Sequence, residues 1–192
     1  MNLVDLLSRN TFHITGVINE ESLKALSNGL QGLAGGRAED GGGSARLTIA
    51  ITSPGGSTAY MAAMRAIIRH TAAAFDTHMV VIGSCYSAAV SLLMAVPRAR
   101  RYATAGSRFM IHPGSVPVEG QLVLDSKRVK DPVQLLGPNL KEALTIEQQD
   151  NDELFRGTKL TRSRLQKMMD NVTFFSAEEA LTHGFIGHIL EV

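Results

Sequence analysis

Residues 79–96 read MVVIGSCYSAAVSLLMAV and predict a buried strand, a turn of small residues and then a helix, with Ser87 at the junction. A serine hydroxyl at such a turn can stand clear of the backbone, while the first N–H groups of the helix remain free to bind a ligand. This position suits a nucleophile. Small residues also suit tight packing of a strand against a helix, so the segment alone leaves both interpretations open.

The same eighteen residues carry no charge and precede Arg98, Arg100 and Arg101, a pattern that resembles a membrane span with a positive flank. Gly83 and the serines in the middle weaken the transfer of this segment into lipid. Its first half is rich in β-branched residues, whereas its second half is rich in Ala, Leu and Met. We therefore expect two elements, with the arginines in a solvated turn.

Two other stretches carry candidate functional groups. Residues 52–57, TSPGGS, follow an apolar strand and precede a long helix, so their backbone N–H groups form a candidate oxyanion hole. Residues 108–113, RFMIHP, form a short apolar run, where a strand edge can direct the imidazole of His112 at Ser87. Taken singly, His112 also fits an ordinary histidine at the end of a strand.

The order and spacing of these stretches resemble the ClpP family, the proteolytic subunits of the Clp protease, which are serine peptidases of the ClpP/crotonase fold. The resemblance implies an α/β superhelix of β-β-α units with a protruding handle, expected here at about residues 114–157. We expect a single domain over residues 1–192. The segments that carry the resemblance run from about Thr11 to Leu190 and are Phe12–Gly16, Ser53–Ser57, Gly83–Ser87, Met110–Pro113 and Phe174–Ile189.

On this resemblance Ser87 matches the family's nucleophile and His112 matches its base. The backbone N–H groups of Gly55 and Ala88 match the oxyanion hole. If the site works in this way, His112 takes the proton of Ser87 and the alkoxide attacks a peptide carbonyl. No metal and no cofactor are expected, since the six histidines form no ligand pair at helical or tight-turn spacing.

The third member of the triad departs from the family's pattern. Counting back from Ser176, the family's aspartate position falls on Val172, which can neither accept a proton nor orient an imidazole. Asp170 and Asn171 lie within two residues of it. We expect Asp170 to complete the triad, because a carboxylate stabilises an imidazolium better than an amide does.

Composition restricts the class of protein. With 192 residues, 44% of them hydrophobic, the chain is long enough for one domain with a substantial core. A formal charge of +1 offers no field for nucleic acid or an anionic membrane, so neither partner is expected. The single cysteine, Cys85, is expected to be buried, which fits a reducing cytoplasm. Residues 1–10 lack the pattern of a signal peptide.

The remaining pattern alternates strands and helices, which argues for a parallel sheet covered on both faces with ligands at the strand ends. Surface loops are expected at 35–44 and 114–120, and residues 121–130 fit a strand or a helix. The expected strands are 11–15, 47–52 and 185–190. Helices are expected after the N-cap Asn19, over 57–74, over 139–155 beyond the prolines at 132 and 138, from Thr161 to Asp170, and from the capping box at Ser176 to Gly184.

The expected function is that of a serine endopeptidase that hydrolyses unfolded proteins or peptides inside an oligomeric ring. A catalytically silent ring subunit is the first alternative, and Val172 favours it. A crotonase-like acyl-CoA enzyme is the second, although that chemistry needs no serine nucleophile.

ClpP-like subunits stack as heptameric rings, and an ATPase docks near a hairpin that precedes the first strand. Only ten residues precede Thr11, too few for that hairpin. We therefore expect a homo-oligomer that admits peptides without a Clp-type ATPase, as a single or a double ring.

Overall fold

The computed structural model describes residues 3–7, 10–36, 46–114 and 132–191, and this part of the chain forms a mixed α/β fold around a seven-stranded sheet. Strands β1, β2, β3, β4 and β7 are neighbours in that order and run parallel, while β5 pairs with the end of β3 and also with β6. The strands are β1 (Thr11–Ile18), β2 (Arg46–Gly56), β3 (Asp76–Tyr86), β4 (Arg101–Thr104), β5 (Arg108–Ile111), β6 (Thr173–Ser176) and β7 (His188–Leu190).

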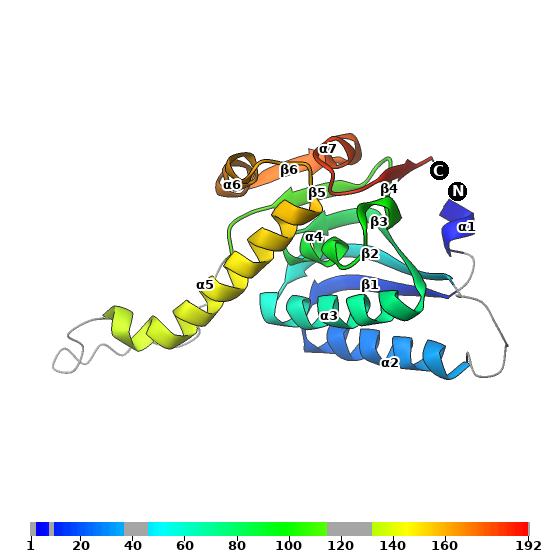
Figure 1. Ribbon diagram of the computed structural model, residues 1–192, viewed down its shortest axis with the longest axis horizontal. Coiled ribbons are helices and arrows are strands. Elements are labelled where there is room, and N and C mark those ends of the chain that lie inside the picture. Colours follow the sequence, from blue (N-terminus) through cyan, green and yellow to red (C-terminus); the bar gives the residue numbers. More distant parts are fainter. Residues whose placement is uncertain (1–2, 8–9, 37–45, 115–131, 192) are drawn as a thin grey trace.

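The helices surround this sheet in layers (Figure 1). Helices α2 and α3 cover one side, α6 and α7 lie beside β6 on the other, and α5 projects away from the body. The helices are α1 (Leu3–Leu7), α2 (Glu20–Gly36), α3 (Thr58–Ala74), α4 (Ala88–Leu92), α5 (Pro132–Gly157), α6 (Arg162–Asp170) and α7 (Ala177–His183), with 3₁₀ turns at Leu93–Ala95 and Arg98–Arg100.

The central strands are buried on both faces, as continuous apolar runs in a parallel sheet require. Residues 47–51 of β2 and 77–81 of β3 are all buried. Helix α2 faces this core through Leu26 and Leu30, and α3 faces it through Met64 and Ile68. The α/β class predicted from the alternating pattern is therefore confirmed.

The apolar run at residues 79–96 divides into two elements, as expected: strand β3 ends at Tyr86 and helix α4 begins at Ala88. In the described ranges, no helix is long and apolar enough to cross a membrane.

The expected solvated turn of arginines is wrong for Arg101. Arg98 is exposed, but Arg101 opens β4 and is only 4% exposed. Its guanidinium donates to the carbonyls of Val96 at 2.8 Å and Gly157 at 2.8 Å, which replace water around the buried charge. Burial lowers the pKa of Arg101 to about 10.

Several predicted boundaries also differ. Strand β1 runs to Ile18 instead of ending at residue 15, and β7 begins at His188 instead of residue 185. Helix α5 begins at Pro132 and runs past the proline at 138, whereas we expected the helix from residue 139. A proline suits the first position of a helix, because a residue there needs no partner for its N–H. Strand β2 continues through Gly56, where a turn was expected, because its pairing with β1 resumes after a register shift. The expected loop at 35–44 and the segments 114–120 and 121–130 fall mostly outside the described residues.

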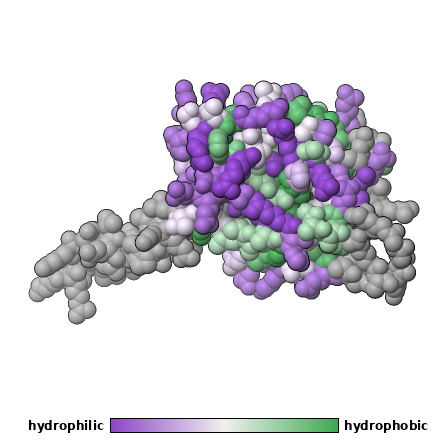
Figure 2. All heavy atoms as spheres, in the orientation of Figure 1, coloured by the Kyte–Doolittle hydropathy of each residue, from purple (hydrophilic) through white to green (hydrophobic). Residues whose placement is uncertain are grey.

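Two ion pairs fasten the body end of α5 to α3. Arg65 Nη1 lies 2.5 Å from Asp150 Oδ1, and these side chains are only 9% and 14% exposed. The second pair, Arg69 with Glu153, is more open to solvent, with side chains 42% and 26% exposed. Figure 2 shows hydrophobic residues gathered over α3 and hydrophilic residues beside them on the same face.

The two pairs differ in burial, so we predict different costs for matched substitutions. Arg65→Met leaves the Asp150 carboxylate buried without its cation and lowers the free energy of unfolding by about 3 kcal/mol. Arg69→Met removes the more exposed pair and costs less than about 1 kcal/mol. Urea unfolding of both variants checks this, and equal losses would contradict the importance of the buried pair.

Candidate active site

Ser87 occupies a sharp bend between β3 and α4. Its φ of 55° and ψ of −128° lie in a region that side chains rarely adopt. The bend is held by the Ser87 N–H, which donates to the Met110 carbonyl at 2.8 Å, and by the Ser87 carbonyl, which accepts from the Val90 N–H at 2.9 Å. Within the described part of the chain, nothing hydrogen-bonds to the Ser87 hydroxyl, so this oxygen is free to react.

A cavity of about 400 Å³ opens beside this serine. It brings together residues from the end of β2, from α4, from the segment after β5, and from α5 and α6. The lining residues are Gly56, Ser57, Thr58, Ser87, Ala88, Ser91, Ile111, His112, Pro113, Gly114, Glu147, Asp150, Asn151, Leu154 and Met169. Three predicted site residues, Ser87, Ala88 and His112, therefore share one cavity.

Cys85, two residues before Ser87, is not a competing nucleophile. Its side chain is fully buried in the core, as expected from the sequence. Burial raises the pKa of its thiol, which keeps the sulfur protonated and inert.

Gly55 lies against the bend rather than in the cavity. A side chain there would place its Cβ 2.7 Å from the Cβ of Ser87, so only glycine fits this contact. The Gly55 N–H already donates to Ser53 Oγ at 3.1 Å, and that hydroxyl donates to the Gly16 carbonyl at 2.6 Å. The structure thus gives the Gly55 N–H a partner other than the oxyanion expected from the sequence.

Gly56 is better placed to supply that donor. It pairs with Ile18 of β1, and the Ser57 N–H donates to the Ile18 carbonyl at 2.9 Å. In a parallel ladder the N–H groups of successive residues point to opposite edges, so the N–H of Gly56 points away from β1, toward the cavity that Gly56 lines. At the other side of the bend, Ala88 begins α4, where N–H groups have no partner within the helix.

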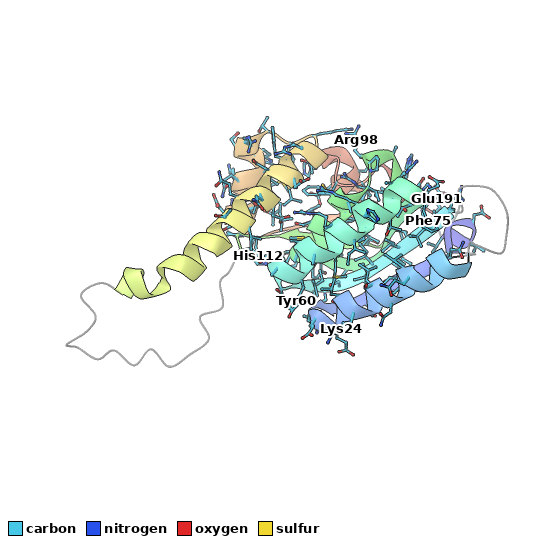
Figure 3. All side chains as sticks on the ribbon, turned by 60° about the horizontal axis from the view of Figure 1, so that its bottom comes forward. Lys24, Tyr60, Phe75, Arg98, His112 and Glu191 are labelled. Atoms are coloured by element: carbon cyan, nitrogen blue, oxygen red, sulfur yellow. The ribbon has the colours of Figure 1, made fainter. Side chains whose placement is uncertain are left out.

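His112 reaches the cavity because β5 runs parallel to the end of β3, with Met110 paired to Tyr86. Figure 3 shows His112 where α5 meets the body. Its Nδ1 lies 2.5 Å from the Pro113 carbonyl oxygen. Since a carbonyl only accepts, Nδ1 carries the proton and Nε2 is the nitrogen that can accept one.

Val172 and His112 each lie one residue beyond the ladder that joins β5 and β6. Strand β6 runs antiparallel to β5, and the last pair at this end is Thr173 with Ile111. Val172 has a φ of 46°, a conformation that is unusual for a β-branched residue, and is 48% exposed. The described lining of the cavity does not include Val172.

The structure does not bring Asp170 or Asn171 into the cavity. Asp170 is exposed at the end of α6, where its Oδ1 accepts from Gln166 Nε2 at 2.8 Å. Asn171 is also exposed, and its Nδ2 donates to the Lys167 carbonyl at 2.8 Å. The aspartate predicted to orient His112 thus has another partner.

Sequence reasoning missed two carboxylates of the cavity, Glu147 and Asp150, both on α5. Glu147 Oε1 accepts the Gly114 N–H at 2.8 Å, and Asp150 Oδ2 accepts the Ser91 hydroxyl at 2.6 Å. Residues three apart share a helix face, so their spacing in the sequence was a signal that these two side chains point the same way. Nothing in the local pattern showed that this face meets Ser87.

Comparison with known proteins identifies the family of this chain. A sequence model described as Clp protease matches residues 5–192, and the chain belongs to the Clp protease family. It is similar to the ATP-dependent Clp protease proteolytic subunit of Deinococcus radiodurans, with 29% identity over 141 residues that cover 73% of this chain and 63% of that protein.

Two further relatives agree. Proteolytic subunit 3 of Frankia casuarinae is 27% identical over 144 residues, which cover 75% of this chain and 62% of the relative. Proteolytic subunit 2 of Thermobifida fusca is 28% identical over 144 residues, which cover 75% and 64%. The chain thus spans less than two thirds of the length of these relatives.

The backbone at Val172 leads to a stability prediction. Asparagine tolerates a left-handed backbone far better than valine, so Val172→Asn should raise the free energy of unfolding by about 1 kcal/mol. Val17 is the matched control because it is exposed and has an ordinary φ. Val17→Asn should not raise the free energy of unfolding. Urea unfolding compares the two, and a loss of stability at both positions would contradict strain at Val172.

Proposed function

We propose that this protein is a serine endopeptidase that uses Ser87 and His112 to hydrolyse peptides or unfolded proteins. The observation that carries the proposal is the bend at Ser87, which leaves its hydroxyl free in a cavity shared with His112, Gly56 and Ala88. The family match supports the same chemistry.

In the proposed mechanism, His112 Nε2 takes the proton as Ser87 Oγ attacks the carbonyl carbon of a peptide bond. The N–H groups of Gly56 and Ala88 stabilise the oxyanion that forms. Such stabilisation is usually the largest single contribution to catalysis in sites of this kind. His112 then returns its proton to the leaving amine, and water, activated by the same imidazole, hydrolyses the acyl-serine.

The Pro113 carbonyl takes the orienting role that a carboxylate has in a complete triad. It fixes the tautomer of His112, but a dipole stabilises the imidazolium less than a full charge does. Losing the aspartate of a serine triad costs about 10⁴-fold in turnover. We therefore expect slow turnover, which makes acylation of Ser87 the better assay.

A second candidate function, a catalytically silent ring subunit, is favoured by Val172 alone. Counting back from Ser176, the family's aspartate position falls on Val172, and a valine cannot orient an imidazole. In that case Ser87 would be unreactive although its backbone is intact.

Labelling with a fluorophosphonate probe distinguishes the two functions. We expect stoichiometric labelling of the wild-type protein, complete loss in Ser87→Ala and a large loss in His112→Ala. Ser84→Ala, the matched control on β3, should label normally because Ser84 does not line the cavity. A wild-type protein that stays unlabelled would favour the silent subunit, and labelling that persists in Ser87→Ala would overturn the assignment.

We also propose that the protein works as a homo-oligomeric ring. Among the described strands β6 pairs only with β5, and its Phe174 is 62% exposed, which is a large apolar surface to leave in water. The projecting helix α5 offers a second contact between subunits (Figure 1). The heptameric single or double ring, the Clp-type ATPase and the cytoplasmic location remain predictions.

Light scattering at micromolar concentration tests the assembly. We expect a mass of several subunits, and a smaller mass for Phe174→Glu because a charge in an apolar contact opposes association. A wild-type monomer would remove the ring and the enclosed chamber that depends on it.

A further inference from the structure

The cavity beside Ser87 has one charged wall, formed by α5. Its other described side chains are uncharged, and Ile111, Leu154 and Met169 form an apolar part of the lining. We propose that this cavity selects a substrate residue with a positively charged side chain, lysine or arginine, and that Glu147 is the residue that selects it. The inference rests on the proposed peptidase function and adds the class of substrate.

Asp150 does not supply the selecting charge, because it is already neutralised. Its two oxygens are taken by Arg65, at 2.5 Å, and by the hydroxyl of Ser91, at 2.6 Å. The Arg65 side chain is only 9% exposed, so this pair is shielded from solvent and stays together. Asp150 and Arg65 together bring no net charge to the cavity.

Among the described residues, no cation pairs with Glu147. Its Oε1 accepts the Gly114 N–H at 2.8 Å, and its Oε2 has no partner among the described residues. None of the described residues that line the cavity is a lysine or an arginine. The described lining therefore carries one uncompensated negative charge.

The arrangement suits a long cationic side chain. With the substrate carbonyl held at Ser87, the aliphatic stem of a lysine or arginine can lie along Leu154 and Met169 while its charged end reaches Glu147. A neutral apolar side chain would cover the Glu147 carboxylate without pairing it, and an acidic side chain would be repelled. Cationic residues are thus favoured and acidic ones rejected.

Peptidyl phosphonates test this selection without multiple turnovers. An active-site serine attacks their phosphorus atom in place of the carbonyl carbon of a peptide bond. Three probes differ only in the residue next to the phosphorus atom: lysine, its uncharged analogue norleucine, and glutamate. The rate constant for modification of Ser87 is measured for each. We expect the lysine probe to react at least about 10-fold faster than the norleucine probe, the effect of one charge-assisted hydrogen bond, and the glutamate probe to react slowest.

Glu147→Gln is the decisive variant, because its amide oxygen can still accept the Gly114 N–H while the charge is gone. The ratio of lysine to norleucine rates should fall to about one. In Glu147→Lys the glutamate probe should become the fastest. Glu20→Gln is the matched control, since it removes an equal charge from an exposed ion pair on α2, and it should keep the wild-type ratio.

The outcomes separate this inference from the proposed function. Modification of Ser87 at equal rates by lysine and norleucine probes would overturn the selection by Glu147 and leave the peptidase intact. A ratio of lysine to norleucine rates that stays at the wild-type value in Glu147→Gln would likewise overturn the selection by Glu147 and leave the peptidase intact. No modification of Ser87 by any probe, together with no fluorophosphonate labelling, would overturn both.

Discussion

The left-handed backbone of Ser87 is the constraint on which the site depends. A non-glycine residue in such a conformation costs about 1–2 kcal/mol, and the surrounding contacts must supply it. The Ser87 N–H is held by the Met110 carbonyl, and Gly55 approaches so closely that no side chain would fit there. The same contacts place β5 beside the end of β3, which carries His112 to the serine. The contacts that hold this one strained residue thus also position the candidate nucleophile, the candidate base and the first N–H of α4.

Local sequence patterns were enough to predict much of this arrangement. The change from β-branched to small and helix-forming residues located the bend at Ser87, and an apolar run located His112. Patterns alone do not show whether Gly55 or Gly56 directs its N–H away from β1. The N–H directions alternate along β2, and the pairing of β2 with β1 shifts its register just before these glycines. Nor could patterns show that Arg101 is buried or that Glu147 faces Ser87, since both depend on packing between segments distant in the chain.

The site differs from a complete triad in where its charges lie. Asp170 and Asn171 are held by hydrogen bonds within α6 and its end, and the Nδ1 of His112 lies against the carbonyl of its own neighbour, Pro113. The carboxylates come instead from α5: Asp150 joins that helix to α3, and Glu147 holds the segment after His112 through Gly114. In the function proposed above, the negative charge therefore lies on the wall that would receive the substrate and not behind the base. Stabilisation of the oxyanion by Gly56 and Ala88 would then carry more of the catalysis.

In the proposed mechanism, Ser87 attacks a carbonyl whose oxygen binds the N–H groups of Gly56 and Ala88. A crystal structure of the fluorophosphonate adduct would test this arrangement, because the phosphoryl oxygen occupies the place of the oxyanion. We expect a bond from Ser87 Oγ to phosphorus, with that oxygen about 3 Å from the nitrogens of Gly56 and Ala88. An adduct on another serine, or an oxygen bound by the N–H of Gly55 instead, would contradict it.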